Sequence, residues 1–506
     1  GDVYKRQPLE RQSIAEGAAE ILSRVTTVSD AMLLDPPAED WLIWQGSYDN
    51  HGFSALNQIN RENVSDLELS WRMPLQTVVN NPGPLVLDGV MYLFTFPDTV
   101  LAIDAGNGSL LWRYEHHSEV QPSQKKGVAL HGDLVYVPTS DLHVLALNAR
   151  TGKLVWDHKI ETDDQYEGYH LRMSPFVVGE TVIQGITSLR IPEGGWIDGI
   201  DRTTGAHKWR FYTIPRPDEP GGNTWNGIPM EERSGGSVWN AGAYDPELDL
   251  VYFGVAPTYN TAPLLYPVNI DGITNDALYT NATIALKPDT GELVWYYQHL
   301  ENDQWDLDWA FERQIVDINF RGLARRAVIN MGKLGILDAV DYATGDYLFS
   351  MDMGLQNVVT DIDPLTGYKN INNINIKAGL NLHKDISFFM NQNIKFNELS
   401  HDCWVLNMSS EYTNNNIDID KTALEKYAQS IFEKTFEIKN EISFIKSHRW
   451  LYAQTKLSYN TISKKNWINS KDNKIFLSGD WVLGKSLSDA WDAGEKLSHY
   501  IKILSV

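Results

Sequence analysis

The sequence predicts a mainly β protein: an incomplete β-propeller of about five to six blades, followed by a small α/β fragment. Two observations lead to this prediction. A tight turn that contains Thr-Gly or Asn-Gly, followed within a few residues by an aromatic side chain, recurs through the first two thirds of the chain. Each copy follows a run of alternating apolar residues, which is typical of strands. With 506 residues, 42% of them hydrophobic, the chain can bury a large core.

Residues 1–35 precede the repeat and form a polar leader. They contain a stretch of helical character, PLERQSIAEGAAEILSRV, which ends shortly before Pro36 and Pro37. The sequence begins with Gly1 instead of Met, which we interpret as a truncated or adventitious end. It shows no signal-peptide pattern and no apolar run long enough to span a bilayer.

The repeat itself is marked by aromatic residues spaced 44, 53, 86 and 54 positions apart: Trp112, Trp156, Trp209, Trp295 and Phe349. Apolar runs at 90–97, 133–139, 180–187 and 249–256 predict strands before these markers. The return of about four strands with one aromatic residue is typical of a propeller blade. We expect each marker Trp to pack between adjacent blades, where its large flat side chain buries much area. A repeated β-sandwich is the alternative.

The composition changes near residue 368. No Pro occurs beyond this point, and Asn, Lys and Ile become frequent. Residues 1–368 contain 25 Lys and Arg against 51 Asp and Glu, whereas residues 369–506 contain 18 against 15. We therefore predict a propeller over residues 36–368, a junction over 369–401 and a separate fragment over 402–506. Two domains with different surfaces would explain the change, and so would a chimera of two unrelated genes.

Charge and cysteine content exclude several classes of function. The net charge of −23 argues against nucleic acid or an anionic membrane as a partner, because both need a basic surface. Cys403 is the single cysteine, which excludes disulfides within the chain and thiolate metal clusters. No Cys-x-x-Cys-His occurs, so the sequence predicts no covalently attached haem.

Residues 36–368 resemble the quinoprotein alcohol dehydrogenases, in which eight blades surround pyrroloquinoline quinone (PQQ). The likeness lies in four long segments that follow in the family's order: 40–71, 235–257, 296–309 and 332–349. It implies an oxidoreductase that oxidises an alcohol or a sugar by hydride transfer to PQQ, with a separate electron acceptor, in the periplasm. Propeller signals end after Phe349, so the resemblance implies an incomplete propeller of the eight-bladed type.

The resemblance also implies catalytic residues. In the family, a Trp after a Gly-Gly pair lies flat under the quinone, and Trp239 matches it. The Asp of a Trp-Asp motif takes the alcohol proton and ligates a metal; Asp306 matches it, with Asp303 and Asp308 as nearby alternatives. Lys333 matches the basic residue that polarises a quinone oxygen. A carboxylate and a cation beside a quinone would suit proton abstraction coupled to hydride transfer.

Three further residues match positions that contact the cofactor in the family. Lys126 matches the basic residue before Gly at the cofactor rim, and Thr187 falls where the family places a hydroxyl donor. Asn81 stands where the family often has a Glu that contacts the cofactor. The alternatives are that Trp239 is an ordinary core tryptophan and that the acidic run around Asp306 is a solvated turn.

The sequence departs from the family in its expected metal ligands and in its missing pair of adjacent cysteines. The metal-binding Glu aligns near Arg190, with Glu193 three residues away, and the metal-binding Asn aligns near Pro257, with Asn260 beyond it. Calcium needs several oxygen ligands, and the match assigns only Asp306. These departures favour an alternative function, a non-catalytic propeller scaffold that has lost its PQQ and metal chemistry.

Residues 402–506 resemble the C-terminal end of renalase-like and amine-oxidase-like FAD-dependent oxidoreductases. The segments HRW, SGDW and AWDAG follow in that order, and residues 420–436 have apolar residues at helical spacing. Gly479 and Asp480 match a strand end before a helix that faces the flavin; an ordinary strand–helix turn is the alternative. A third hypothesis is therefore an FAD-dependent oxidoreductase. The sequence has no Gly-x-Gly-x-x-Gly, so we expect no autonomous FAD binding.

Overall fold

The computed structural model describes residues 13–75, 82–163, 167–356, 358–371, 378–391 and 404–435, together with 442, 444–447, 468–469 and 476–477. The chain divides into two compact units, Gly1–Ile374 and Asn375–Val506. Within the described ranges, no helix is both long and apolar enough to cross a membrane.

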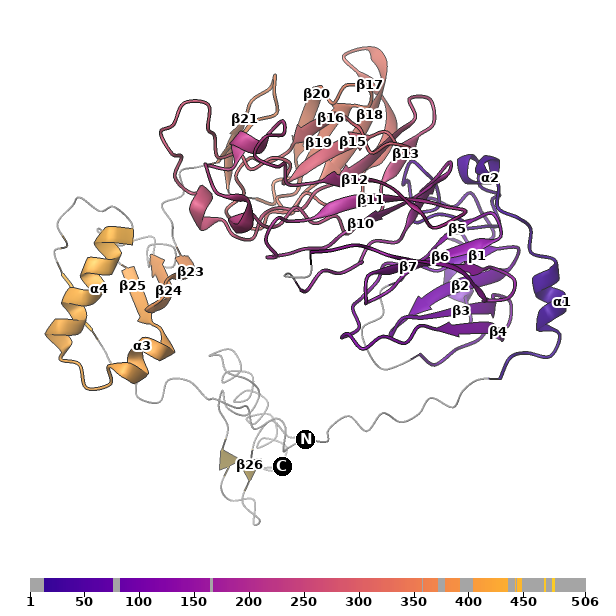
Figure 1. Ribbon diagram of the computed structural model, residues 1–506, viewed down its shortest axis with the longest axis horizontal. Helices are drawn as coiled ribbons and strands as arrows, with labels where there is room; N and C mark the ends of the chain where they lie inside the picture. The colour runs from indigo at the N-terminus through magenta and orange to yellow at the C-terminus, as the bar shows by residue number, and fades with distance from the viewer. Residues whose placement is uncertain are drawn as a thin grey trace. The chain divides into compact units, whose positions relative to one another are not determined.

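The first unit consists mainly of four-stranded antiparallel sheets, each with its strands in chain order (Figure 1). In the described part there are five such sheets, and their strands are β1 (Leu85–Leu87), β2 (Val90–Thr95), β3 (Thr99–Asp104), β4 (Leu110–Glu115), β5 (Ala129–His131), β6 (Leu134–Pro138), β7 (His143–Asn148), β8 (Leu154–Lys159), β9 (Phe176–Val178), β10 (Thr181–Gly185), β11 (Trp196–Asp201), β12 (His207–Tyr212), β13 (Ala243–Asp245), β14 (Leu250–Gly254), β15 (Ala282–Leu286), β16 (Leu293–Gln298), β17 (Gln314–Phe320), β18 (Leu323–Met331), β19 (Ile336–Asp341) and β20 (Tyr347–Asp352). A two-stranded sheet, β21 (Val359–Ile362) and β22 (Lys369–Ile371), follows. This order confirms the predicted mainly β fold, an incomplete propeller whose sheets are the blades.

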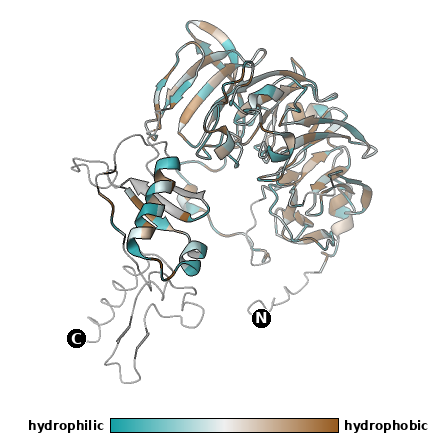
Figure 2. Cartoon of the chain, turned by 60° about the vertical axis from the view of Figure 1, so that its left-hand side comes forward, coloured by the Kyte–Doolittle hydropathy of each residue, from teal (hydrophilic) through white to brown (hydrophobic). Residues whose placement is uncertain are grey.

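The four apolar runs predicted as strands form the second strand of the first four sheets: β2, β6, β10 and β14. Strands β10 and β14 are buried at every position instead of at every second one. Both faces of these inner strands are therefore covered, which explains why the sequence reads as continuous apolar runs. The hydropathy colouring in Figure 2 shows brown, hydrophobic segments interleaved with teal, hydrophilic ones in the strands of the first unit.

The marker tryptophans join each sheet to the next. The indole N–H of Trp112 donates to the carbonyl of Ala149 at 2.8 Å. Gly152, with φ of 66°, lies so close to this ring that a Cβ there would stand 2.8 Å from it. The same contact between a ring and a turn glycine recurs for Trp71 with Gly108, Trp156 with Gly205, Trp209 with Gly291, and Trp295 with Gly345. The expectation that the marker Trp packs between adjacent blades is therefore confirmed.

The two ends of this series differ from its middle. Trp71 docks on the first sheet, with its indole N–H 2.9 Å from the carbonyl of Ala105, although residues 69–75 form no strand. At the other end, Phe349 has no indole N–H to donate. The turn glycine that follows it, Gly367, instead lies against Tyr297 and Tyr347. The docking geometry therefore begins before the first sheet and ends at the fifth.

Short helices lie outside the sheets of the first unit. The predicted helical leader contains α1 (Ala18–Ser23), and α2 (Asp30–Leu34) follows, its first turn capped by the Ser29 hydroxyl, which accepts from the Met32 N–H at 3.3 Å. Single 3-10 turns complete the described helices: η1 (Val64–Asp66), η2 (Gly222–Thr224), η3 (Met230–Glu232) and η4 (Ala262–Leu264).

The second unit contains a three-stranded sheet and two helices in its described part. These are β23 (Ala378–His383), β24 (Ile386–Asn391), β25 (Trp404–Met408), α3 (Ser410–Asn415) and α4 (Lys421–Thr435), with a small pair of strands, β26 (Ile468–Asn469) and β27 (Phe476–Leu477). Helix α4 confirms the helix predicted over 420–436. The Asp420 carboxylate accepts from the Thr422 N–H at 2.9 Å, and the rings of Trp404 and Phe432 lie 5.3 Å apart. Gly479 and Asp480 lie outside the described residues.

Candidate functional site

The acidic loop between β16 and β17 is built around a buried carboxylate. Asp303 is 1% exposed and accepts from the backbone N–H groups of Trp305 and Leu307, at 2.8 and 2.7 Å, and from the Asn281 amide at 2.8 Å. Burial raises the pKa of Asp303. These bonds fold the loop so that Asp306, whose φ is 58°, presents a half-exposed carboxylate. Asp303 therefore organises the loop, and Asp306 is the accessible acid.

Lys333 lies against this loop. Its Nζ stands 3.1 Å from Oδ2 of Asp306 and 3.6 Å from Oδ2 of Asp308, and it donates to the backbone carbonyl of Asp306 at 3.0 Å. The backbone N–H of Lys333 also donates to the carbonyl of Leu307 at 3.0 Å. Burial raises the pKa of Asp308, and the ammonium of Lys333 partly opposes that rise.

Trp239 and Lys126, predicted from separate segments, meet in space. The Nζ of Lys126 lies 5.1 Å from the ring centroid of Trp239 and 5.6 Å from that of Trp44. An ammonium over an indole face is an attractive cation–π contact. The ring of Phe311, three residues after Asp308, meets Trp239 edge-on at 5.6 Å. The segment that continues the acidic loop therefore contacts the predicted cofactor platform.

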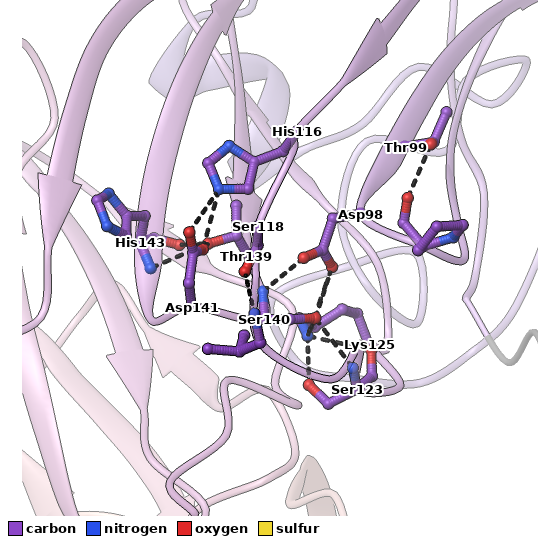
Figure 3. Close-up of polar contacts among 12 residues, drawn as sticks. Asp98, Thr99, His116, Ser118, Ser123, Lys125, Thr139, Ser140, Asp141 and His143 are labelled. Atoms are coloured by element: carbon purple, nitrogen blue, oxygen red, sulfur yellow. Dashed lines mark hydrogen bonds and ion pairs between the residues drawn. The ribbon is translucent and has the colours of Figure 1, made fainter. Parts of the chain in front are cut away.

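Lys125, the neighbour of Lys126, is anchored in a network of hydroxyl groups and a carboxylate (Figure 3). Its ammonium is completely buried and donates to the Ser123 carbonyl at 3.1 Å and to the Ser140 hydroxyl at 3.2 Å, with Asp98 at 3.8 Å. Ser140 in turn donates its backbone N–H and its hydroxyl to Asp98, at 2.7 and 2.9 Å. Burial lowers the pKa of Lys125 to about 8, although Asp98 raises it. This network holds the chain on which Lys126 stands.

Buried polar atoms without hydrogen-bond partners flank Trp239. Thr187 is 2% exposed and Asn240 is 3% exposed, yet Oγ1 of the first and Oδ1 of the second have no partner. The Val238 N–H donates to the carbonyl of Ile186 at 2.9 Å, which places Thr187 beside the Trp239 segment. A buried polar atom without a partner costs about 1–3 kcal/mol, so a ligand that supplies one is favoured here.

Two further residues near this region were not predicted from the sequence. The Ser174 hydroxyl is buried without a partner and lies 3.0 Å from where a Cβ of Gly127 would stand, next to Lys126. Burial raises the pKa of Tyr259, and the carboxylate of Asp308 raises it further. A lone Ser or Tyr has no spacing pattern, so only the folded chain reveals these positions. Asn81 lies outside the described residues.

These residues fit a flat anionic cofactor of the PQQ type. PQQ is a planar tricarboxylate, and the site offers the indole face of Trp239, the ammonium of Lys126 and the unpartnered hydroxyl of Thr187. An aromatic face suits a planar ring, and a cation and a hydroxyl suit carboxylates. The donor set and the chemistry of the cofactor therefore agree.

The same region offers few carboxylate ligands for a calcium ion. Among the described residues, no group of three or more His, Cys, Asp and Glu side chains could hold a metal. Glu193 pairs with Arg216 at 3.4 Å, and the Asn260 amide donates to the Glu232 carbonyl at 3.4 Å, so the two substitute ligands have other partners. The ammonium of Lys333 stands where a cation would approach Asp306. The expected calcium ligation at Asp306 therefore lacks a supporting shell.

Comparisons with known proteins agree with this picture. Residues 41–354 match the family model described as the β-propeller domain of glucose, ethanol and alcohol dehydrogenases. The chain is 33% identical over 354 residues to the dehydrogenase subunit of a quinone alcohol dehydrogenase of Gluconacetobacter polyoxogenes, covering 65% of this chain and 47% of that protein. It is 34% identical over 346 residues to the quinohemoprotein alcohol dehydrogenase ADH IIB of Pseudomonas putida, covering 65% and 49%.

Solved structures show the same relationship. The quinohemoprotein alcohol dehydrogenase ADHIIG of Pseudomonas putida HK5 superposes with a TM-score of 0.63 at 27% identity, covering 72% of this chain and 59% of that one. The chain spans about half the length of the curated relatives that it matches. Its family model covers more than half of its residues. The chain therefore belongs to the family of the PQQ-type β-propeller domains of glucose, ethanol and alcohol dehydrogenases.

Proposed function

We propose that this chain is the propeller part of a PQQ-dependent oxidoreductase that oxidises an alcohol or a sugar. The observation that supports it best is the contact between Asp306 and Lys333 at 3.1 Å, in a loop whose continuation packs on Trp239. A half-exposed carboxylate held beside a cation, close to an aromatic platform, suits removal of a proton from a bound alcohol.

Three residues would hold the cofactor. Trp239 would stack on its ring system, Lys126 would neutralise a carboxylate, and Thr187 would donate its hydroxyl. Asn81 is a fourth proposed contact from the sequence match. When bound, PQQ supplies the acceptor for the hydride that leaves the alcohol carbon.

Asp306 would act as the general base. Its Oδ2 contacts Lys333, and Oδ1 is the atom to which we assign the proton from the alcohol hydroxyl. Lys333 would also stabilise negative charge that develops nearby as the proton leaves. Asp308 is 4% exposed, so the more accessible Asp306 is the better base.

The partners and location are proposed from the relatives. Several of them are named as dehydrogenase subunits or quinohemoproteins, which supports a separate electron acceptor for this chain. We propose a periplasmic location on the same family resemblance. The strong negative charge supports partners other than nucleic acid or an anionic membrane.

A titration of the purified chain with PQQ tests this function. We expect quenching of tryptophan fluorescence, a shift in the quinone absorption and reduction of a dye when a primary alcohol is added, with and without Ca²⁺. Trp239→Ala should abolish PQQ binding, whereas Trp239→Phe, which keeps a flat ring, should retain part of it. Binding that survives Trp239→Ala would show that the cofactor platform lies elsewhere.

A second variant separates catalysis from binding. Asp306→Asn should keep PQQ affinity and lower kcat by about 10³-fold, because a positioned base contributes roughly 10²–10⁴-fold. The exposed Asp218→Asn is the matched control and should turn over normally. Full activity in Asp306→Asn would show that another residue is the general base.

One observation favours the alternative of a non-catalytic propeller scaffold: the described residues offer no metal shell around Asp306. A scaffold would fold normally and leave the quinone spectrum unchanged in the same titration. The FAD hypothesis rests on residues 402–506, whose Gly479 and Asp480 lie outside the described residues, and a yellow protein on purification would support it.

A further inference from the structure

A charged network is buried behind the acidic loop. The Nζ of Lys369 in β22 lies 2.7 Å from Oδ2 of Asp338 in β19, and both side chains are completely buried. His299, directly after β16, donates from Nδ1 to the same oxygen at 2.8 Å. Ser350 donates its hydroxyl to the other carboxylate oxygen at 2.6 Å. Three sheets therefore meet at one carboxylate.

The protonation states in this network follow from burial. Burial lowers the pKa of His299 to about 4, so the ring is neutral near pH 7. Its Nδ1 carries the hydrogen that it donates to Asp338 in the hydrogen bond, and its Nε2 accepts from the Thr283 hydroxyl at 2.7 Å. Burial also lowers the pKa of Lys369, and Asp338 opposes this. The network is then one cation, one anion and one neutral ring, and losing either ion would leave the other unpaired.

The network holds the indole of Trp309. The His299 ring stacks on Trp309 at 4.7 Å with an angle of 3° between the planes, and the ammonium of Lys369 lies 4.9 Å from the Trp309 ring. Trp309 is fully buried, and its indole N–H has no hydrogen-bond partner. Stacking, the cation and packing therefore determine where this ring lies.

Trp309 is linked to the segments that carry both members of the proposed Asp306–Lys333 pair. It directly follows Asp308, and its backbone N–H donates to the Asn281 side chain at 3.2 Å, which ties it to the acidic loop. Gly332 lies against its ring, where a Cβ would stand 2.5 Å from the indole. Gly332 precedes Lys333, so the turn that carries this lysine rests directly on the indole.

We propose that Lys369, Asp338 and His299 are positioning residues that hold Trp309 and, through it, keep the ammonium of Lys333 against Asp306. The inference rests on the proposed function, because it assigns a role to the geometry of the Asp306–Lys333 pair. It gives the hairpin β21–β22 a direct role at the site: the ammonium of Lys369 joins β22 to Trp309, beside apolar side chains of the hairpin that pack on the same buried cluster.

Chemical labelling of the full chain without cofactor tests the positioning. A water-soluble acetylating reagent modifies lysines at rates that mass spectrometry resolves residue by residue. We expect Lys369→Met to speed acetylation of Lys333 about fivefold, a coupling of the size seen between residues in one network. Lys153, an exposed lysine on a distant turn, should keep its rate. Lys369→Arg, which keeps the cation, should leave Lys333 protected.

A matched control separates positioning from general loss of stability. Arg210 pairs with the completely buried Asp198 at 2.7 Å in the third sheet, so Arg210→Met also removes the partner of a buried carboxylate. Lys333 should keep its wild-type rate in Arg210→Met. If Lys369→Met does not fold, the double variant Lys369→Met/Asp338→Asn, which removes both charges, replaces it and should give the same acceleration.

The outcomes separate this inference from the proposed function. Wild-type labelling of Lys333 in a folded Lys369→Met or double variant would overturn the inference, as would equal acceleration in Arg210→Met. If the wild-type chain fails to bind PQQ, the proposed function is wrong. The labelling experiment still tests whether the buried network positions Lys333. If it binds and turns over, Lys369→Met should lower kcat about tenfold, with KM within about twofold, as expected when a transition-state interaction is misplaced. Unchanged kcat would also overturn the inference.

Discussion

Two adjacent lysines, Lys125 and Lys126, have opposite environments. One is buried among the hydroxyls of Ser123 and Ser140, and the other reaches over the indole of Trp239. Alternation along an extended segment predicts that neighbours point to opposite sides. The sequence match could select Lys126, but the anchor of Lys125 was not predictable, because Ser140 lies 15 residues away, in the turn between β6 and β7.

The buried contacts of His299 were likewise not predictable from the sequence. This residue makes a testable contribution to the free energy of unfolding. An unfolded His has a pKa near 6.5, and burial lowers that of His299 to about 4. Because the folded pKa is depressed, the stabilisation is fully present above pH 6.5 and is lost as the pH falls toward 4. That loss is roughly 3 kcal/mol in the free energy of unfolding.

Denaturant unfolding of the first unit, followed by tryptophan fluorescence at several pH values, measures this. His299→Gln should flatten the decline between pH 6.5 and 4 by about that amount, while the exposed His117→Gln should leave the slope as in the wild type. Equal slopes in all three proteins would show that folding does not lower the pKa of His299.

At the scale of elements, the repeat was predictable because its signals are local. The apolar runs became β2, β6, β10 and β14, and the Thr-Gly turns lie against the marker rings. Trp71 was not assigned as a marker, because no Thr-Gly or Asn-Gly turn precedes it in the sequence. Lys369 lies one residue past the expected end of the propeller at 368, yet it pairs with Asp338, since a change in composition does not reveal a buried contact.

A glycine substitution tests the contact between ring and turn. Gly152→Ala should lower the free energy of unfolding by about 3 kcal/mol, because it combines a positive φ with a clash against Trp112. Gly89→Ala is the matched control: its φ is 76°, but no atom lies within 4 Å of the new Cβ. It should cost only about 1 kcal/mol. Equal costs would mean that the ring moves aside freely.

At the scale of the molecule, the two parts of the chain differ in net charge. Residues 1–368 hold 51 acidic and 25 basic residues, while residues 369–506 are close to balanced. The compositional break and the two compact units are separate observations, and whether the chain is a chimera stays a prediction. The resemblance to a flavoenzyme could not be followed into the structure, because its two site residues lie outside the described ranges.

The excess of acidic residues predicts a salt effect. Self-repulsion destabilises a strongly charged compact state, and salt screens it over about 10 Å at 0.1 M. Raising NaCl from about 0.01 to 0.15 M should therefore increase the free energy of unfolding of the first unit by about 1 kcal/mol. KCl should act equally, since the effect depends on ionic strength. A flat or falling response would indicate that favourable ion pairs outweigh the repulsion.

The docking of each marker Trp on the next turn has a consequence for cooperativity. Every such contact joins neighbours only, as in a one-dimensional array in which each unit is stabilised by the unit beside it. When one sheet unfolds, the adjacent sheet therefore loses its stabilising contact, and we expect unfolding to proceed stepwise along the series. The step after the fifth sheet has no such indole contact, because Phe349 supplies no N–H to the turn at Gly367, and the buried Lys369–Asp338 ion pair joins β22 to the fifth sheet there instead.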